Sequence, residues 1–456
     1  MFINSFLEKS KKYLSSIFFP LSIALVSFLI WITPVPYNWI FVTFYIVFSF
    51  FPLILKEGKT YIPLLLFSFI SVNEGYTFTT IPVILITLLS AISISICTFI
   101  FIHKCRFAKG DLLIPLIGLI ITLFISYIFN SIEMSTMISE GMLYILFLFL
   151  SVLAYIFLST ILGQGESITY LSWSLVSMCI IIYLQVFVFF VTNNYDLVTD
   201  NFNLGWSTNK DIATFFLLTS IPFIITLINQ KKHFYLIPLF LNILFIILLA
   251  SDAGILSLIF FIIPIVLLTF RSYKRIYPYI SLSILTIFIV TFALLIIYNK
   301  SFNERVLSAI KTLLFFNEPN KVLNDLFKNS FEAVKANPYV GKSISFYIYT
   351  KSNLELLSSN TYLTTLVLGG SLSLIAYFFL DVSIFIRCLT KKEKGKYLFL
   401  LYLIMFEFIG LITNTLYNLQ IFNFFLTCNC VYLMSNRPDD AIIHTGYIDN
   451  KMNLFN

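Results

Sequence analysis

Long apolar stretches alternate with short polar ones along almost the whole chain, and this pattern predicts its architecture. A helix needs about 20 residues to cross the hydrocarbon core of a membrane. Most of the apolar stretches approach or exceed that length, whereas one of them is only about a dozen residues long and is expected to be re-entrant or tilted. The pattern therefore predicts about 12–14 transmembrane helices. The fourteen apolar segments are residues 17–33, 38–55, 61–72, 79–102, 112–130, 141–161, 168–191, 212–229, 235–250, 255–270, 277–298, 361–386, 397–413 and 419–434.

The composition of the chain agrees with this pattern. Of its 456 residues, 59% are hydrophobic and 11% are charged, whereas about 25% are charged in an ordinary soluble domain. A soluble domain of this size would expose large apolar patches, and a disordered chain has the opposite balance. Because the apolar runs are long and uninterrupted, we expect an all-α, polytopic membrane helical bundle and not a β-barrel.

The basic residues are distributed unevenly over the predicted loops. If the N-terminus is cytoplasmic and the segments alternate, 20 of the 29 Lys and Arg residues fall on the cytoplasmic side. The short outside loops contain one, Lys210, and the other eight lie in one long outside loop, residues 299–358. Cytoplasmic loops are enriched in Lys and Arg, so both termini are predicted to be cytoplasmic. The formal charge of +7 is thus an orientation signal and not a nucleic-acid-binding surface.

The long outside loop divides the chain into three regions. These are an N-terminal transmembrane bundle (1–298), a large extracytoplasmic loop (299–358) between the third- and fourth-last apolar segments, and C-terminal transmembrane helices with a cytoplasmic tail (359–456). Only one other outside segment, residues 192–211, is long enough to carry a site.

Within the large loop, the charged residues from Lys321 to Lys335 recur at steps of four and three. This spacing predicts an amphipathic helix, capped by Asn320 and ended by Asn337-Pro338. Its apolar face is expected to contain Leu323, Phe327, Phe331 and Val334. A second amphipathic stretch precedes it, with an apolar side formed by Phe302, Val306, Ile310 and Leu313.

The apolar segments contain few ionisable residues. Asp252 lies at a turn, Asp381 lies within a segment, and Glu407 is the only one expected deep in a span. We interpret Glu407 either as a proton or substrate site or as a polar group in helix packing. A carrier usually lines its path with ionisable groups, so their scarcity counts against a transporter. No metal-binding motif occurs, and all three histidines map to the cytoplasm, so no metal or other cofactor is expected.

Three passages carry a resemblance to a known family. The first is Leu204-Gly205-Trp206-Ser207-Thr208-Asn209 with Ala213, and the second is Leu249-Ala250-Ser251-Asp252-Ala253-Gly254. The third contains Glu304-Arg305-Val306, then Asn337-Pro338-Tyr339-Val340-Gly341, then Ser359-Asn360-Thr361-Tyr362-Leu363 and Gly369-Gly370. In this order, and over roughly residues 204–370, the chain resembles the superfamily of O-antigen ligases and O-antigen polymerases.

The chain departs from the family pattern at two positions, and the first departure favours one member of the superfamily. Ligases of this superfamily carry a histidine before the Asn-x-Tyr-Leu run, whereas this chain has Ser359 there. In the second motif, the family has an arginine at the turn, whereas this chain has Asp252. We therefore expect a polymerase rather than a ligase that transfers the finished glycan to a final acceptor. A flippase or transporter of lipid-linked saccharides is the alternative from another class. A structural or sensor membrane protein is the least specific interpretation.

The resemblance implies metal-independent glycosyl transfer on the outer face of a bacterial cell (inner) membrane. The donor would be a glycan on undecaprenyl pyrophosphate, and the acceptor would be a sugar hydroxyl of another lipid-linked repeat. The product would be an O-antigen, a capsule or a similar polysaccharide of the cell envelope. A flippase and a chain-length regulator are the protein partners that the resemblance implies.

Such a reaction needs cations to stabilise the leaving pyrophosphate and a base to accept the hydroxyl proton. The predicted catalytic residues are Arg305 as a cation and Glu332 as the base, with Asp200 and Glu355 as reserves. In the alternative interpretation, Arg305 pairs with a neighbour or a lipid phosphate, and Glu332 pairs with Lys328. The residues predicted to bind substrate are Lys321, Lys210, Asn209, Trp206, Asn360, Tyr362 and Gly341. Among these, the asparagines and Tyr362 either orient sugars or cap helices, and Gly341 permits a turn.

Overall fold

The computed structural model describes most of the chain between residues 2 and 434. Every regular element in the described part is a helix, which confirms the all-α prediction there. The described ranges are 2–32, 38–55, 58–67, 80–105, 107–130, 138–162, 166–192, 210–230, 233–249, 251–271, 277–298, 300, 303–304, 306–307, 321–346, 360–390, 395–417 and 419–434.

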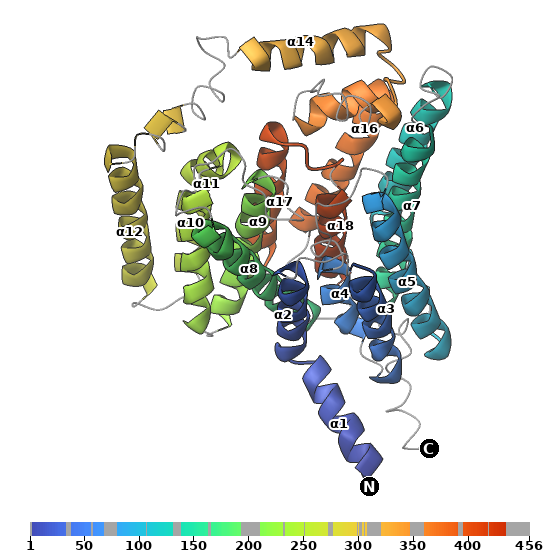
Figure 1. Ribbon diagram of the computed structural model, residues 1–456, viewed down its shortest axis with the longest axis vertical. Coiled ribbons are helices and arrows are strands. Elements are labelled where there is room, and N and C mark those ends of the chain that lie inside the picture. The colour runs from blue at the N-terminus through green and yellow to red at the C-terminus, as the bar shows by residue number, and fades with distance from the viewer. Residues whose placement is uncertain are drawn as a thin grey trace.

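Most helices stand side by side in a bundle (Figure 1). The first half of the chain forms α1 (Phe2–Leu14), α2 (Phe18–Ile32), α3 (Asn38–Leu55), η1 (Gly58–Thr60), α4 (Tyr61–Phe67), α5 (Thr80–Ile102), α6 (Leu113–Asn130), α7 (Ile138–Ile161) and α8 (Glu166–Thr192). The second half forms α9 (Lys210–Asn229), η3 (His233–Tyr235), α10 (Leu236–Leu249), α11 (Asp252–Arg271), α12 (Tyr277–Tyr298), α14 (Lys321–Ala336), α16 (Thr361–Thr390), α17 (Lys396–Ile412) and α18 (Leu419–Met434).

Several helices are suited to cross a membrane, which makes this a multi-pass membrane protein. In the described part, five helices are long and apolar enough to span a membrane. The number rises to six if α1 and α2, which are bent by 71° at their junction, form one span together. Six further apolar helices have 10–17 described residues. This count covers only the described part, so the predicted 12–14 spans stay a prediction. The five are Leu113–Asn130, Gly141–Ile161, Ser167–Thr192, Lys210–Asn229 and Thr361–Thr390.

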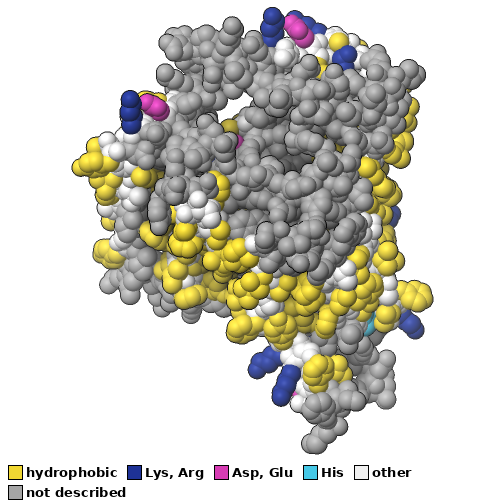
Figure 2. All heavy atoms as spheres, in the orientation of Figure 1, with side chains coloured by type: hydrophobic (Ala, Val, Ile, Leu, Met, Phe, Trp, Pro, Cys, Tyr) yellow, Lys and Arg dark blue, Asp and Glu magenta, His cyan; other side chains and the backbone are white. Residues whose placement is uncertain are grey.

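The packing of the bundle fits an apolar surrounding. At its core, α9 packs against α8, α10, α11 and α17, and 89% of its apolar window is buried, against 33–61% in the other four spans. Outer helices such as α6 instead expose isoleucine and phenylalanine side chains. Figure 2 shows hydrophobic side chains over much of the described surface of one face, with lysine and arginine mainly toward its upper and lower margins. Lipid is the solvent that such a surface requires.

Contacts between turns divide the bundle into two ends. At one end, the Tyr170 hydroxyl donates to the Leu14 carbonyl (2.7 Å), and Gln230 donates to Thr169 (2.9 Å). At the same end, the Lys59 ammonium lies over the Tyr170 ring, and the Ser159 hydroxyl donates to the Ala108 carbonyl. Arg387 also forms an ion pair with Asp111 there (3.0 Å). All of these turns are on the predicted cytoplasmic side. The predicted outside turns contact one another at the other end, as described below.

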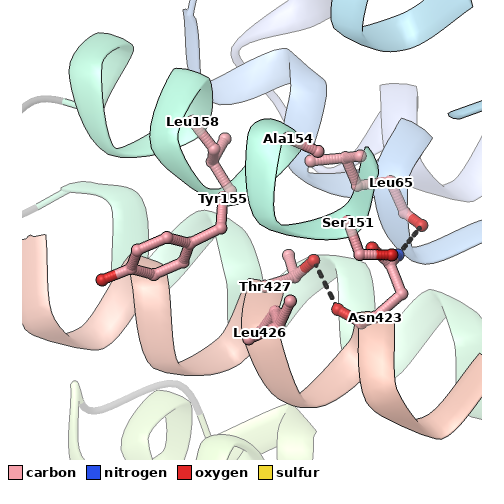
Figure 3. Close-up of a pocket in the computed structure, with 8 residues that line it drawn as sticks. All are labelled: Leu65, Ser151, Ala154, Tyr155, Leu158, Asn423, Leu426 and Thr427. Atoms are coloured by element: carbon pink, nitrogen blue, oxygen red, sulfur yellow. Dashed lines mark hydrogen bonds between the residues drawn. The ribbon is translucent and has the colours of Figure 1, made fainter. Parts of the chain in front are cut away.

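The short third segment does not extend across the bundle in its described part. Instead of a span over residues 61–72, α4 is seven residues long and buried. Its Leu65 carbonyl accepts a hydrogen bond from Asn423 of α18 (3.1 Å). Figure 3 shows this junction of α4, α7 and α18, where Ser151, Thr427 and apolar neighbours close around Asn423. The space between these side chains does not admit a water-sized sphere, so the junction is a packing contact.

The predicted amphipathic helix of the large loop is confirmed as α14, which lies across one end of the bundle (Figure 1). The predicted apolar face is confirmed at Val334, which packs against the core, but not at Phe331, and the side chains of Leu323 and Phe327 lie outside the described residues. Ser330 and Ala333 are buried, and α14 packs against α16, whereas Phe331 is 53% exposed. Small residues allow the closest approach of two helices, which explains why the buried positions are not the largest apolar ones. Of the preceding stretch, Val306 is buried, and Phe302, Ile310 and Leu313 lie outside the described residues.

Candidate functional site

The predicted span 361–386 is not one continuous helix. Within α16, Gly370 has φ +66° and ψ −168°, so the helix is broken there. This combination of angles is essentially restricted to glycine because a side chain would clash with its own backbone. A break in a membrane helix exposes carbonyl groups that need new partners.

The Asn337–Ser343 turn supplies those partners. The backbone N–H of Lys342 donates to the Val367 carbonyl (2.7 Å), and that of Ser343 donates to the Leu368 carbonyl (2.9 Å). In return, Ser371 donates to the Pro338 carbonyl (2.9 Å). The turn and the break thus satisfy each other's backbone groups.

Glycine is required on both sides of this contact, which we call the turn–break junction (residues 337–343 with 367–371). A Cβ at Gly341, whose φ is +75°, would lie 2.5 Å from the Gly370 nitrogen and the Leu368 carbonyl carbon. A Cβ at Gly370 would collide with the Tyr339 carbonyl group. For Gly341, this geometry matches the interpretation that the residue permits a turn.

The end of α6 holds the junction from the side. Ser126 donates to the Leu368 carbonyl (2.6 Å), and the Asn130 amide donates to the Gly341 carbonyl (3.1 Å). Asn337 also reaches the Asn130 side chain, at 3.5 Å. These two α6 residues were not predicted from the sequence, because nothing in a transmembrane segment marks which of its polar side chains faces a distant turn.

The two halves of α16 bend toward each other. In a straight helix, Tyr362 and Tyr377 would be about 22 Å apart along the axis, but their ring centroids are 5.6 Å apart. Tyr362 also stacks on Phe378, with centroids 5.5 Å apart. The break therefore folds the first half of α16 back toward the second.

A buried polar cluster lies inside this bend. The hydroxyls of Tyr362 and Tyr377 both donate to Oε2 of Glu407 on α17, over 2.6 and 3.3 Å. Asp381 lies one turn after Tyr377 on the same helix face, is 7% exposed, and interacts with Glu407. The expectation that Glu407 is the only deeply placed ionisable residue is wrong. Asp381 joins it because the two helices pack together, a contact that sequence spacing does not reveal.

Asn360 caps the broken helix. Its side-chain oxygen accepts from the Leu363 N–H (3.0 Å), and its amide donates to the Leu411 carbonyl (2.9 Å). Next to it, Thr361 donates to the Thr413 carbonyl (3.1 Å). Of the two interpretations given to Asn360, these bonds match helix capping.

The second motif passage contacts α9 directly after Ala213, whereas Leu204–Asn209 of the first passage lie outside the described residues. The Ser251 hydroxyl contacts Thr214 of α9 (2.9 Å) and accepts the Gly254 N–H (3.0 Å) at the start of α11. A Cβ at Gly254 would lie 2.5 Å from a Thr214 methyl group. The Asp252 side chain lies outside the described residues.

The remaining predicted site residues are only partly placed. Glu332 is exposed on α14, and Lys210 begins α9 with its side chain 8% exposed. Lys321 begins α14, and its side chain lies outside the described residues. Arg305, Asn209, Trp206, Asp200 and Glu355 lie outside the described residues altogether. In the described part, no three His, Cys, Asp or Glu side chains are grouped to hold a metal ion.

No protein-family model, curated protein or solved structure matches this chain.

Proposed function

We propose that the protein is a polymerase of oligosaccharide repeat units carried on undecaprenyl pyrophosphate. It acts by metal-independent glycosyl transfer on the outer face of a bacterial cell membrane. The turn–break junction is the observation that supports this proposal. Asn337–Gly341 and Gly369-Gly370 are two parts of the third passage on which the family resemblance rests, and they interlock through backbone hydrogen bonds. An accidental likeness gives no reason for these two parts to pack together.

The proposed reaction assigns a role to most of the predicted residues. The acceptor hydroxyl oxygen bonds to the anomeric carbon of the donor, and the bond from that carbon to pyrophosphate breaks. Glu332 accepts the hydroxyl proton, and its exposure on α14 leaves it open to an outside substrate. Arg305, Lys321 and Lys210 stabilise the leaving undecaprenyl pyrophosphate. Asn209, Trp206 and Tyr362 contact the sugars.

The test is a polymerisation assay with the purified protein in lipid vesicles. A lipid-linked single repeat serves as both donor and acceptor, and products are separated by size. The proposal predicts a ladder of longer lipid-linked glycans with the wild-type protein and none with Arg305→Ala. Transfer of whole chains to a different acceptor, without lengthening, would instead identify a ligase.

One observation favours a second function, a flippase or transporter of lipid-linked saccharides. Broken membrane helices and paired intramembrane carboxyl groups are features of transporters, and the chain has both at Gly370 and at Asp381–Glu407. The two functions differ in their product. A flippase moves a fluorescent lipid-linked saccharide between the leaflets of a vesicle without lengthening it, and a polymerase lengthens it.

A further inference from the structure

The cluster inside the bend of α16 has an unusual balance of charge. Two carboxyl groups, Asp381 and Glu407, lie together in membrane helices. Neither forms an ion pair with a basic side chain among the described residues, whereas Asp111, for example, pairs with Arg387. Two adjacent negative charges without a cation are strongly unfavourable in a low-dielectric interior. One of the two carboxyls must therefore be neutral.

The hydrogen bonds indicate where the negative charge lies. Oε2 of Glu407 accepts from two tyrosine hydroxyls, Tyr362 and Tyr377, and such bonds favour the ionised form of a carboxyl group. Asp381 receives no such donor. Its Oδ1 is buried without a hydrogen-bond partner in the described part. A proton on Asp381 allows it to donate to Glu407 and removes the repulsion between the two groups.

Apart from Asp381, the titratable groups described around Glu407 are tyrosines and one cysteine. Facing it are Tyr362, Tyr377 and Asp381 of α16 and Tyr402 of its own helix, with Cys428 of α18 behind Tyr402. Helices α9 and α11 also pack against α17, and they contribute phenylalanine rings next to Phe406 and Phe408. The charge of the cluster is thus set by its two carboxyl groups.

We propose that Asp381 and Glu407 form a proton-binding site within the membrane. One exchangeable proton is shared by the two carboxyl groups, and Tyr362, a partly exposed residue, connects the site to the surface of α16. The ligand of this site is a proton and not a metal cation. The site does not depend on the proposed glycosyl transfer, because its chemistry involves no sugar.

A hydrophobic carbodiimide, dicyclohexylcarbodiimide, tests this directly. The reagent enters lipid and reacts with a protonated carboxyl group: the proton moves to a carbodiimide nitrogen, the carboxyl oxygen bonds to its central carbon, and rearrangement gives a stable N-acylurea. The full-length protein in phospholipid vesicles is treated over mildly acidic to mildly alkaline pH in choline buffer. Peptide mass spectrometry then locates and quantifies the adduct. Asp111, paired with Arg387 at the end of the bundle, is the internal control and should stay unmodified.

The proposal predicts an adduct on Asp381 or Glu407 whose rate of formation falls as the pH rises. Replacing choline by sodium at constant ionic strength should leave the rate unchanged. Protection by sodium would overturn the proposal in favour of a cation site. A missing adduct, or a rate independent of pH, would overturn it as well.

A variant separates a shared proton from two independent carboxyls. In Asp381→Asn, Glu407 loses its charged neighbour and keeps its two tyrosine donors, so its affinity for a proton falls. The rate at which Glu407 is labelled should then fall by at least about tenfold, which corresponds to a tenfold lower affinity for the proton. Labelling of Glu407 at the wild-type rate in this variant would contradict proton sharing.

Discussion

The hydroxyl of Tyr362 donates a 2.6 Å hydrogen bond to Glu407, a residue 45 positions later in the chain. The same carboxylate oxygen accepts from Tyr377. Tyr362 lies before the break in α16 and Tyr377 lies after it, so one carboxylate on α17 holds both halves of the broken helix. Glu407 therefore fixes the bend, in addition to the proton chemistry proposed for it.

Removal of this bond should weaken the fold measurably. Tyr362→Phe keeps the ring contacts with Tyr377 and Phe378 and removes only the hydroxyl. Because hydrogen bonds to charged groups contribute about 1.5–3 kcal/mol, we expect the free energy of unfolding to fall by about that amount. Thermal unfolding of the detergent-solubilised protein measures it. The matched control is Tyr279→Phe, whose ring is 72% exposed. Equal unfolding temperatures for both variants would contradict the role given to Glu407.

The turn–break junction makes a second prediction, about glycine. Gly370→Ala forces a side chain into a glycine-only conformation and into the Tyr339 carbonyl group. Strain of this kind costs about 1–3 kcal/mol before the collision is added, so we expect a markedly lower unfolding temperature. Gly118→Ala in α6 is the control, because a Cβ there meets nothing within 4 Å. Alanine is the better helix former by about 1 kcal/mol, so Gly118→Ala should match or exceed the wild type. A Gly370→Ala protein as stable as Gly118→Ala would show that the break is not required.

Much of the bundle was predictable because its signals are local. Uninterrupted apolar runs predict membrane helices regardless of what they pack against. Charged residues that recur every three or four positions predicted α14, and Asn337-Pro338 predicted where it ends. Alternation of the spans predicted which turns share an end, and contacts such as Arg387–Asp111 agree with that grouping. Each of these conclusions depends only on residues near one another in the sequence.

The site was less predictable because it depends on distant partners. Gly369-Gly370 lies within a predicted continuous span, and the break there is shown only by the backbone angles of Gly370 and by the hydrogen bonds from the Lys342 and Ser343 N–H groups. Asp381 and Glu407 are on different helices, so no spacing rule pairs them. The face of α14 was misjudged at Phe331, because small residues rather than large ones meet α16. Hydrophobicity predicts burial poorly where lipid covers the outside.

The orientation of the bundle can be tested with single cysteines. Lys335 on α14 and Lys109 before α6 are both exposed and lie at opposite ends of the predicted topology. A membrane-impermeant maleimide applied to intact cells should label Lys335→Cys, and it should label Lys109→Cys only after the cells are permeabilised. The wild-type protein, with its six free cysteines, gives the background. The reverse labelling pattern would place the termini outside and contradict the proposed topology.

The base assignment predicts a loss of activity without a loss of stability. Glu332 is exposed, so Glu332→Gln should leave the unfolding temperature unchanged. General base catalysis typically contributes about 10²–10⁴-fold, and the polymerisation rate should fall by that order. Lys328→Gln, one turn earlier on α14 and also exposed, is the control. If both variants lengthen glycans at the wild-type rate, another group accepts the proton.

The measurement that tests the central claim most directly is the size of the glycans that a cell retains on its lipid carrier when this gene is deleted. If the protein is the polymerase, the carrier should hold single repeat units on the outer face of the membrane, and the wild-type gene should restore long chains. Full-length chains that accumulate on the carrier would contradict the polymerase and indicate a ligase.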